Sequence, residues 1–200
     1  MPDSPYDINL QNSSLDHKIV IGLEKIHELV KVLFIEKSNQ LKLSPVQIQL
    51  LFFVKHHAQS LCTTSYLAAE FQLTKATISD SIKRLIEKNL LHKTPSPSDT
   101  RSFSVQLTQQ GIATLAQLEK AANPLLHGIK ALSKTEKAAL WNSLFQLLSQ
   151  FAALGILNLQ RSCISCGHYE KSGKTSFCHF LQQNLQPKEL RLDCPEHLTA

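Results

Sequence analysis

The segment from Cys62 to Thr108 constrains the fold of this chain more strongly than any other stretch. Apolar residues one helical turn apart predict a short helix over residues 65–71. A tight turn follows, and Thr74 stands where its hydroxyl can accept hydrogen bonds from the free amides of a second helix. The segment therefore begins as two helices joined by a short turn.

The second helix has one apolar face and one polar face. Ile78, Ile82 and Leu85 recur at the spacing of a single buried stripe. Small polar groups near the start of the opposite face, with cations further along, suit a helix that enters the major groove of DNA and contacts the flanking phosphates. The residues expected to face DNA on this helix are Lys75, Ala76, Thr77, Ser79, Lys83 and Arg84.

A β-hairpin is predicted after the second helix. Asn89 is suited to end the helix in the left-handed conformation, and residues 90–91 begin a short strand. Residues 94–100 contain two prolines, which exclude helix and central strand and indicate a loop. Residues 103–107 alternate apolar and polar side chains, as in a strand with one buried face. Two helices and a turn followed by a hairpin make a winged helix-turn-helix.

This stretch resembles the winged helix of the MarR family of bacterial transcriptional regulators. The resemblance is carried by LAAEFQLTKATISDSIKRLIEKNLL over residues 67–91, by Asp99-Thr-Arg101, and by VQLTQQG over residues 105–111. In the family an arginine in this wing position lies in or near the minor groove, so the resemblance implies that role for Arg101, oriented by Asp99. Family members often have glycine where this chain has Asn89, and asparagine tolerates the same backbone conformation.

The resemblance also implies an assembly and a function. In helical layout it covers residues 15–155, and it is specific only in the winged helix. MarR-like proteins dimerise through their N- and C-terminal helices, which correspond here to residues 15–38 and 108–156, around a DNA-binding core at residues 44–108. The implied function is a transcriptional regulator that binds double-stranded DNA at a pseudo-palindromic operator as a homodimer. A pocket for a small-molecule effector is implied as well.

The predicted fold class is mainly α with a small β-hairpin wing. It comprises a winged helix-turn-helix, a helical dimerisation region and a short metal-binding tail. Residues 1–14 are interpreted as a flexible arm, 15–158 as the MarR-like domain and 159–200 as the cysteine-rich tail. The flanking helices carry more apolar surface than one small domain needs, which favours a bundle with a second copy; helices that fold back on their own domain are the alternative.

Composition limits the other classes of function. A net charge of +5 and a pI near 9.0 favour a polyanionic partner, but they suit a surface-basic enzyme equally well. The sequence has no apolar run long enough to span a bilayer and no secretory pattern at its N-terminus, which predicts a cytoplasmic protein with reduced thiols and no membrane partner. Catalytic motifs are not recognisable, so we expect no enzyme. The alternative function is a winged-helix protein-interaction module with a zinc-binding docking tail.

Four of the five cysteines lie in the last fifth of the chain. Cys163, Cys166, Cys178 and Cys194 have the spacing C-x2-C-x11-C-x15-C. The first pair forms a knuckle in which two thiolates can bind one ion, and the other two cysteines complete a four-sulfur site. The tail is too short and too poor in aliphatic residues for a core of its own, and a bound ion would supply the missing cross-link.

The identity of the group at this site is open at the level of sequence. The knuckle and the nearby His168, His179 and His197 suit zinc, and a histidine could replace one cysteine. The singly spaced cysteines and the proline after Cys194 are also seen in iron–sulfur ligation, which would make the tail part of a redox-sensing regulator. Free thiols, or a disulfide formed only under oxidation, are the remaining alternative. We predict zinc, with an iron–sulfur cluster as the second interpretation.

Overall fold

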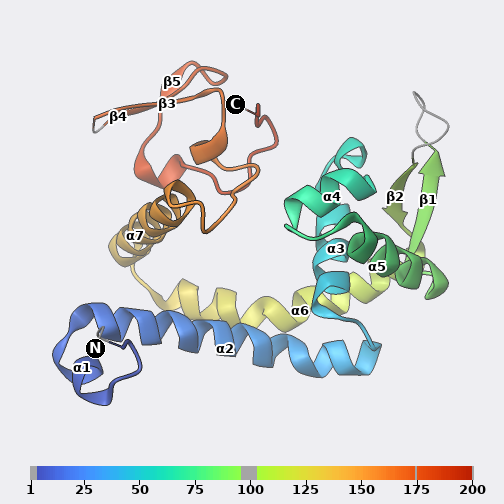
Figure 1. The fold of residues 1–200 in the computed structure, drawn as a ribbon, viewed down its shortest axis with the longest axis horizontal. Helices are drawn as coiled ribbons and strands as arrows, with labels where there is room; N and C mark the ends of the chain where they lie inside the picture. Colours follow the sequence, from blue (N-terminus) through green and yellow to red (C-terminus); the bar gives the residue numbers. More distant parts are fainter. Residues whose placement is uncertain (1–3, 96–102, 174, 200) are drawn as a thin grey trace. The chain divides into compact units, whose positions relative to one another are not determined.

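The computed structural model describes residues 4–95, 103–173 and 175–199 (Figure 1). The helices are α1 (Ile8–Ser13), α2 (Leu15–Leu41), α3 (Pro45–His56), α4 (Thr64–Glu70), α5 (Lys75–Glu87), α6 (Gln109–Ala131) and α7 (Lys134–Ala153), with short 3-10 helices η1 (Gln59–Leu61), η2 (Cys163–Ser165) and η3 (Pro187–Glu189). The strands are β1 (Leu91–Pro95), β2 (Phe103–Leu107), β3 (Tyr169–Ser172), β4 (Thr175–Cys178) and β5 (Gln183–Asn184). This order confirms the predicted fold class of a mainly helical chain with a small antiparallel hairpin. In the parts that the structure describes, no helix is both long enough and apolar enough to span a membrane.

The chain forms two compact units. One contains Met1–Cys62 with Ser79–His127, and the other contains Thr63–Ile78 with Gly128–Ala200. The buried apolar residues of the first unit are Leu43, Ile48, Leu50, Leu51, Phe53, Cys62, Ile82, Leu85, Leu90, Leu91, Val105, Leu115 and Leu118. Those of the second unit are Leu67, Ala68, Ile78, Phe145, Cys163 and Leu185.

Side-chain caps define where the predicted helices begin. Ser44 accepts a hydrogen bond from the Gln47 amide, and the Gln47 side chain accepts one from the Ser44 amide, which forms a capping box at the start of α3. Thr74 accepts from the Thr77 amide at 3.1 Å and caps α5. Asn89 has a φ of 56°, so α5 ends in the left-handed conformation that the sequence predicts.

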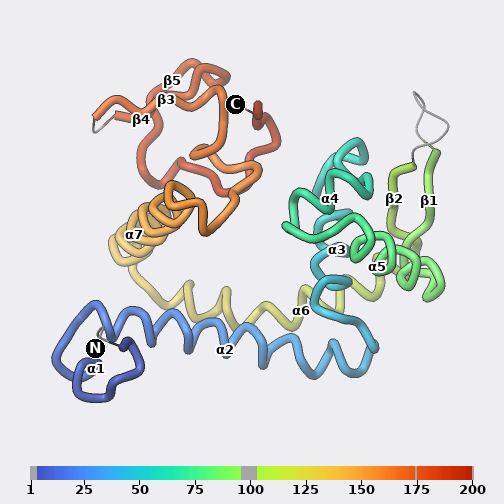
Figure 2. Tube along the Cα trace, in the orientation of Figure 1, coloured from blue at the N-terminus to red at the C-terminus, as the bar shows by residue number. Residues whose placement is uncertain are grey.

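The hairpin and the start of α6 are packed tightly in the first unit. Strands β1 and β2 pair from Leu91 opposite Leu107 to Pro95 opposite Phe103. A Cβ atom on Gly111 would lie 2.1 Å from the Leu90 carbonyl oxygen, so only glycine permits this approach of α6. Figure 2 follows the same path along the backbone, from α5 through the hairpin into α6.

Three local features differ from the sequence-based expectation. Residues 8–13, within the predicted flexible arm, form a helix because Asp7 accepts hydrogen bonds from two amides of its first turn. Strand β1 includes Pro95, which was expected in the loop; a two-stranded hairpin has only edge strands, where proline is tolerated. Helix α6 continues through Pro124 to Ala131, although proline normally kinks or ends a helix; only one backbone hydrogen bond is lost there, and the turns on either side are helical.

The cysteine-rich tail is folded on α7 within the second unit. Ser133 and Glu136 form a capping box at the start of α7, and the tail adds a three-stranded sheet in the order β3-β4-β5. The Trp141 indole donates a hydrogen bond to the Pro187 carbonyl at 3.0 Å, and Phe145 is buried with Leu185 and Cys163 of the tail. The tail thus obtains from α7 the apolar core that its own composition cannot provide.

Candidate nucleic-acid interface and cysteine site

Helix α5 has the buried stripe and the open face that its sequence predicts. Ile78, Ile82 and Leu85 are at most 2% exposed. The six helical residues predicted to face DNA are exposed: Lys75, Ala76, Thr77, Ser79, Lys83 and Arg84. The helix is therefore anchored through one side and leaves its polar side available to a partner; the assignment of individual contacts to DNA stays a prediction.

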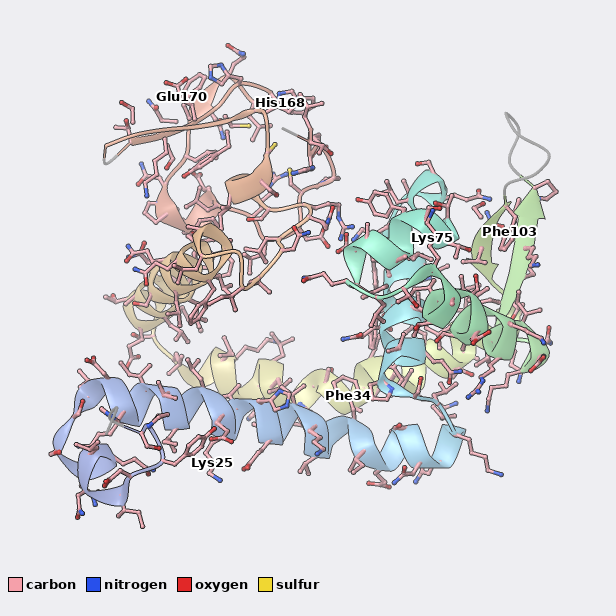
Figure 3. The ribbon with its side chains drawn as sticks, in the orientation of Figure 1. Lys25, Phe34, Lys75, Phe103, His168 and Glu170 are labelled. Carbon is pink, nitrogen blue, oxygen red and sulfur yellow. The ribbon has the colours of Figure 1, made fainter. Side chains whose placement is uncertain are left out.

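A groove lies between residues 79–87 of α5 and the hairpin, within the first unit. Its lining consists of Ser79, Asp80, Ile82, Lys83, Ile86 and Glu87 from the helix, with Lys93 from β1 and Phe103 from β2. The Lys93 ammonium lies 4.2 Å from the centroid of the Phe103 ring, which orients it by a cation–π contact. Figure 3 labels Lys75 at the start of α5 and Phe103 at the start of β2. Sequence reasoning missed Lys93, because the alternation of strand β1 places it on the same face as the buried Leu91, and yet its side chain is exposed.

The charge of this interface is positive but mixed. Lys83 and Arg84 form no ion pair with a carboxylate of the described residues, so both cations are available to phosphates. Asp80 and Glu87 are exposed on the same helix and reduce its net charge. The wing residues Asp99 and Arg101 lie outside the described residues, so their predicted roles are untested.

The second candidate site is a cavity lined by all four cysteines of the tail. Cys163 begins η2, Cys166 forms a β-bridge with Thr199, Cys178 ends β4, and Cys194 follows η3. The Cys166 amide donates to the Cys163 carbonyl at 3.3 Å, which forms the tight turn of the predicted knuckle. The fold thus brings together four sulfurs that are up to 31 residues apart in the sequence, from 163 to 194. Over the described ranges, however, no three His, Cys, Asp or Glu side chains adopt a closed metal-binding arrangement.

Hydrogen-bond donors are directed at two of these sulfurs. The Arg191 amide donates to Cys163 Sγ at 3.3 Å, and Arg191 Nη1 donates to Cys194 Sγ at 3.6 Å. Burial raises the pKa of the Cys163 thiol, the Arg191 amide lowers it, and the neighbouring cysteines raise it further through charge repulsion. Thiolates that share one cavity repel one another, and a cation bound among them offsets that repulsion.

The three histidines near the knuckle are arranged differently from one another. His168 lines the cysteine cavity. His179 Nε2 lies 2.8 Å from a Glu170 carboxylate oxygen, and His197 Nε2 lies 3.0 Å from the Ser165 carbonyl oxygen. His168 is therefore the best placed of the three to replace a cysteine ligand.

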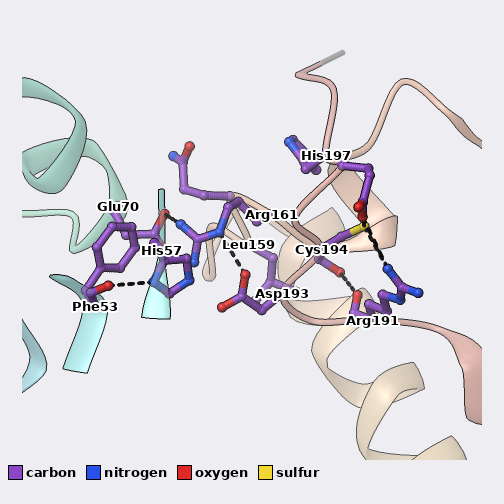
Figure 4. A network of polar contacts seen from close by, with 12 residues as sticks. Phe53, His57, Glu70, Leu159, Arg161, Arg191, Asp193, Cys194 and His197 are labelled. Carbon is purple, nitrogen blue, oxygen red and sulfur yellow. Dashed lines mark hydrogen bonds and ion pairs between the residues drawn. The ribbon is translucent and has the colours of Figure 1, made fainter. Parts of the chain in front are cut away.

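Sequence reasoning also missed an ion-pair network that begins beside the first knuckle cysteine. Arg161 is 7% exposed and contacts the carboxylates of Glu70 and Asp193, as Figure 4 shows. A buried arginine two residues before Cys163 looks like any surface cation in a sequence. Its partner Glu70 is 91 residues away, and no local pattern connects them.

Comparison with known proteins relates the chain to one family. Residues 41–102 match the model of the MarR family. The chain is 26% identical over 115 residues to the HTH-type transcriptional repressor NicR of Pseudomonas putida, a match that covers 58% of this chain and 67% of that protein. A MepR mutant from a multidrug-resistant S. aureus clinical isolate has a TM-score of 0.56 and 22% identity, covering 66% of this chain and 96% of the other. Apo wild-type MarR from E. coli has a TM-score of 0.50 and 23% identity, covering 67% and 96%. At these identities the two structures show a shared fold.

Proposed function

We propose that this chain, a MarR-family protein by its winged helix, is a transcriptional regulator that binds double-stranded DNA as a homodimer. The observation that carries the proposal is the outward face of α5, which is polar, cation-bearing and exposed, opposite a stripe whose residues are at most 2% exposed. Such a helix fits the major groove, where its first residues meet base edges and its later cations meet phosphates. The function is binding and release of DNA, with no catalytic step.

The residue roles follow from position along the helix. Thr77 and Ser79, near the start of α5, are placed for base edges, and Lys83 or Arg84 for phosphate. The family resemblance adds insertion of Arg101 into the minor groove, oriented by Asp99. It also adds a small-molecule effector, which in this family commonly relieves repression.

Helix α2 supports the homodimer. It has no buried residue, although its large apolar side chains point in several directions around the helix axis. Those that are substantially exposed are Leu15, Ile19, Val20, Leu23, Ile26, Leu29, Val32 and Ile35. A helix that is apolar on most sides is stable in water only when other helices cover it, and a second copy of the chain offers a matching surface.

Footprinting on the DNA upstream of the protein's own coding sequence tests the proposal. We expect a protected site with two half-sites about one helical turn apart, because two α5 helices related by a twofold axis read successive major grooves. Affinity should fall steeply as salt is raised, since phosphate contacts release counterions. Saturable binding that is lost in Arg101→Ala at matched salt would add the wing to the interface. If no saturable, salt-dependent binding occurs on any duplex, the winged helix is instead a protein-interaction module.

We further propose that the four cysteines of the tail bind zinc, with an iron–sulfur cluster as the alternative. Support comes from the shared cavity, the knuckle turn and the hydrogen-bond donors directed at Cys163 and Cys194. Among the described residues the four sulfurs are not in a closed metal-binding arrangement, so binding of one ion requires them to move closer together. Four thiolates fill a tetrahedral zinc site, which suits a structural or sensory ion.

Metal analysis of protein purified without added metal tests the second proposal. We expect colourless protein with about one zinc ion per chain, falling to about half or less in Cys178→Ser, because a lost thiolate opens the site. Ile164→Val is the matched control, since it trims a neighbouring side chain and leaves all four sulfurs. Brown protein whose visible absorption disappears in air would identify an iron–sulfur cluster instead. Protein without stoichiometric metal under either condition contradicts the site.

A further inference from the structure

Arg161 joins the cysteine-rich tail to the helix-turn-helix. Its Nη1 lies 2.9 Å from Glu70 Oε2, and its Nε lies 2.8 Å from Asp193 Oδ1 (Figure 4). The Arg161 side chain is 7% exposed and the Glu70 side chain 17%. Burial by itself lowers the pKa of Arg161, but hydrogen bonds with Asp193 and Tyr66 and the charges of the two carboxylates raise it overall. The guanidinium is therefore a permanent cation that bridges two anions.

On the side of the cysteine-rich tail, the bridge is connected to the cysteine site through the backbone. Asp193 is bonded directly to Cys194, whose amide donates to the Arg161 carbonyl at 2.9 Å. The Cys163 amide donates to the Arg191 carbonyl, also at 2.9 Å. Segments 161–163 and 191–194 are thus paired through their backbones, and each contributes one cysteine and one member of the bridge. A shift of the backbone at Cys163 or Cys194 would therefore move the charged groups beside them.

The other end of the bridge is attached to the turn that precedes α5. Glu70 is the last residue of α4, and Gln72, with a φ of 52°, turns the chain toward α5. The Gln72 side chain also donates to the Asn158 carbonyl at 3.4 Å. Thr63–Ile78 and Gly128–Ala200 form one compact unit, which holds the first turn of α5 together with the tail. The residues placed for base edges therefore follow a turn that contacts residues 158 and 161 through Gln72 and Glu70.

We propose that zinc at the four-cysteine site controls how the first turn of α5 is presented to DNA, with Arg161 as the positioning residue. The inference rests on the proposed function, because it requires both the ion and the DNA. Bound zinc fixes Cys163 and Cys194, and with them the carboxylate of Asp193, so the bridge to Glu70 holds the turn in one conformation. When zinc leaves, segment 191–194 is no longer fixed and Asp193 separates from Arg161. DNA binding must then order the turn, and affinity falls.

Affinity for DNA with and without zinc measures this coupling in the full-length protein. We expect removal of zinc by a chelator to weaken binding about 10-fold, within the usual range for coupled sites. In Glu70→Gln the ratio of the DNA affinities with and without zinc should fall below about 2-fold, because the charge at the far end of the bridge is gone. The zinc content should be unchanged, because the cysteines are intact. Glu170→Gln is the matched control: it removes the carboxylate that contacts His179 in the tail and should retain the wild-type ratio.

Hydrogen exchange gives a second readout that does not depend on DNA. Zinc should slow amide exchange over residues 63–78 in the wild-type protein and leave it unchanged in Glu70→Gln. Asp193→Asn is a second variant for which zinc should leave the exchange unchanged; the substitution is isosteric and the side chain is half-exposed. By thermodynamic reciprocity, operator DNA should also tighten zinc binding by the same factor.

The outcomes separate this inference from the proposals beneath it. If the wild-type protein binds zinc but its DNA affinity is the same with and without the ion, the coupling is overturned, while DNA binding and the metal site remain in place. Protein that takes up no zinc overturns the coupling together with the metal site. Protein that binds no DNA contradicts the proposed regulator. In that case the coupling is tested by hydrogen exchange alone, and it is contradicted if zinc does not change the exchange rates over residues 63–78.

Discussion

Reversing the charges of Lys83 and Arg84 together is expected to weaken operator binding by about 100-fold or more at fixed salt. Both side chains are exposed on α5 and have no carboxylate partner within the described part of the chain. Lys83→Glu with Arg84→Glu removes attractive contacts and adds repulsion against phosphates. If each cation neutralises one phosphate, the slope of log affinity against log salt should decrease by about 2. Fluorescence anisotropy across a salt series measures both quantities.

The control for this pair changes the same net charge elsewhere. Lys134→Glu with Lys188→Glu alters two exposed lysines at the starts of α7 and η3, where a carboxylate suits the helix N-terminus. Its affinity should stay within a fewfold of wild type. Equal losses in the two double variants would mean that total charge, and not the face of α5, governs binding.

Placing glutamates at Ile19 and Ile26 should convert the dimer to monomers. The two side chains are 50% and 56% exposed in the isolated chain and lie about two helical turns apart on one side of α2. Burial of each contributes about 1.5–3 kcal/mol per copy, and each variant copy also buries a charge, so the dissociation constant should rise by at least about 1,000-fold. Sedimentation velocity over a concentration series measures the change.

The matched variant introduces glutamate at polar positions of the same helix. Lys18→Glu with Lys31→Glu should leave the dimer intact at micromolar concentration, because both lysines are exposed and add little apolar contact. The monomeric variant should also lose most of its affinity for the full operator, since it retains one half-site. A dimer that persists in Ile19→Glu with Ile26→Glu would mean that α2 is covered by another surface.

The features that sequence predicted correctly depend on neighbours in the chain. Thr74 caps α5 with an amide three residues away, and Ile78, Ile82 and Leu85 need only helical spacing to form their stripe. The left-handed end of α5 at Asn89 is equally local. Each signal is written within one or two turns of backbone, so a single sequence is enough to detect it.

The features that sequence missed join distant segments. The Arg161–Glu70 contact closes a separation of 91 residues, and the core that Phe145 shares with the tail closes a separation of tens of residues. The passage of α6 through Pro124 was missed because a local rule disfavours it. The cysteines are an intermediate case: spacing predicted that four thiols would meet, and they line one cavity, but spacing alone cannot determine whether their sulfurs close around an ion.

The hydrogen bond from Trp141 to Pro187 and the burial of Phe145 make α7 and the tail inseparable in folding. Any opening that detaches the tail would expose two aromatic rings of α7 to water. Any unfolding of α7 would remove the apolar side chains against which the tail packs. We therefore infer that both segments lose their protection in one cooperative event.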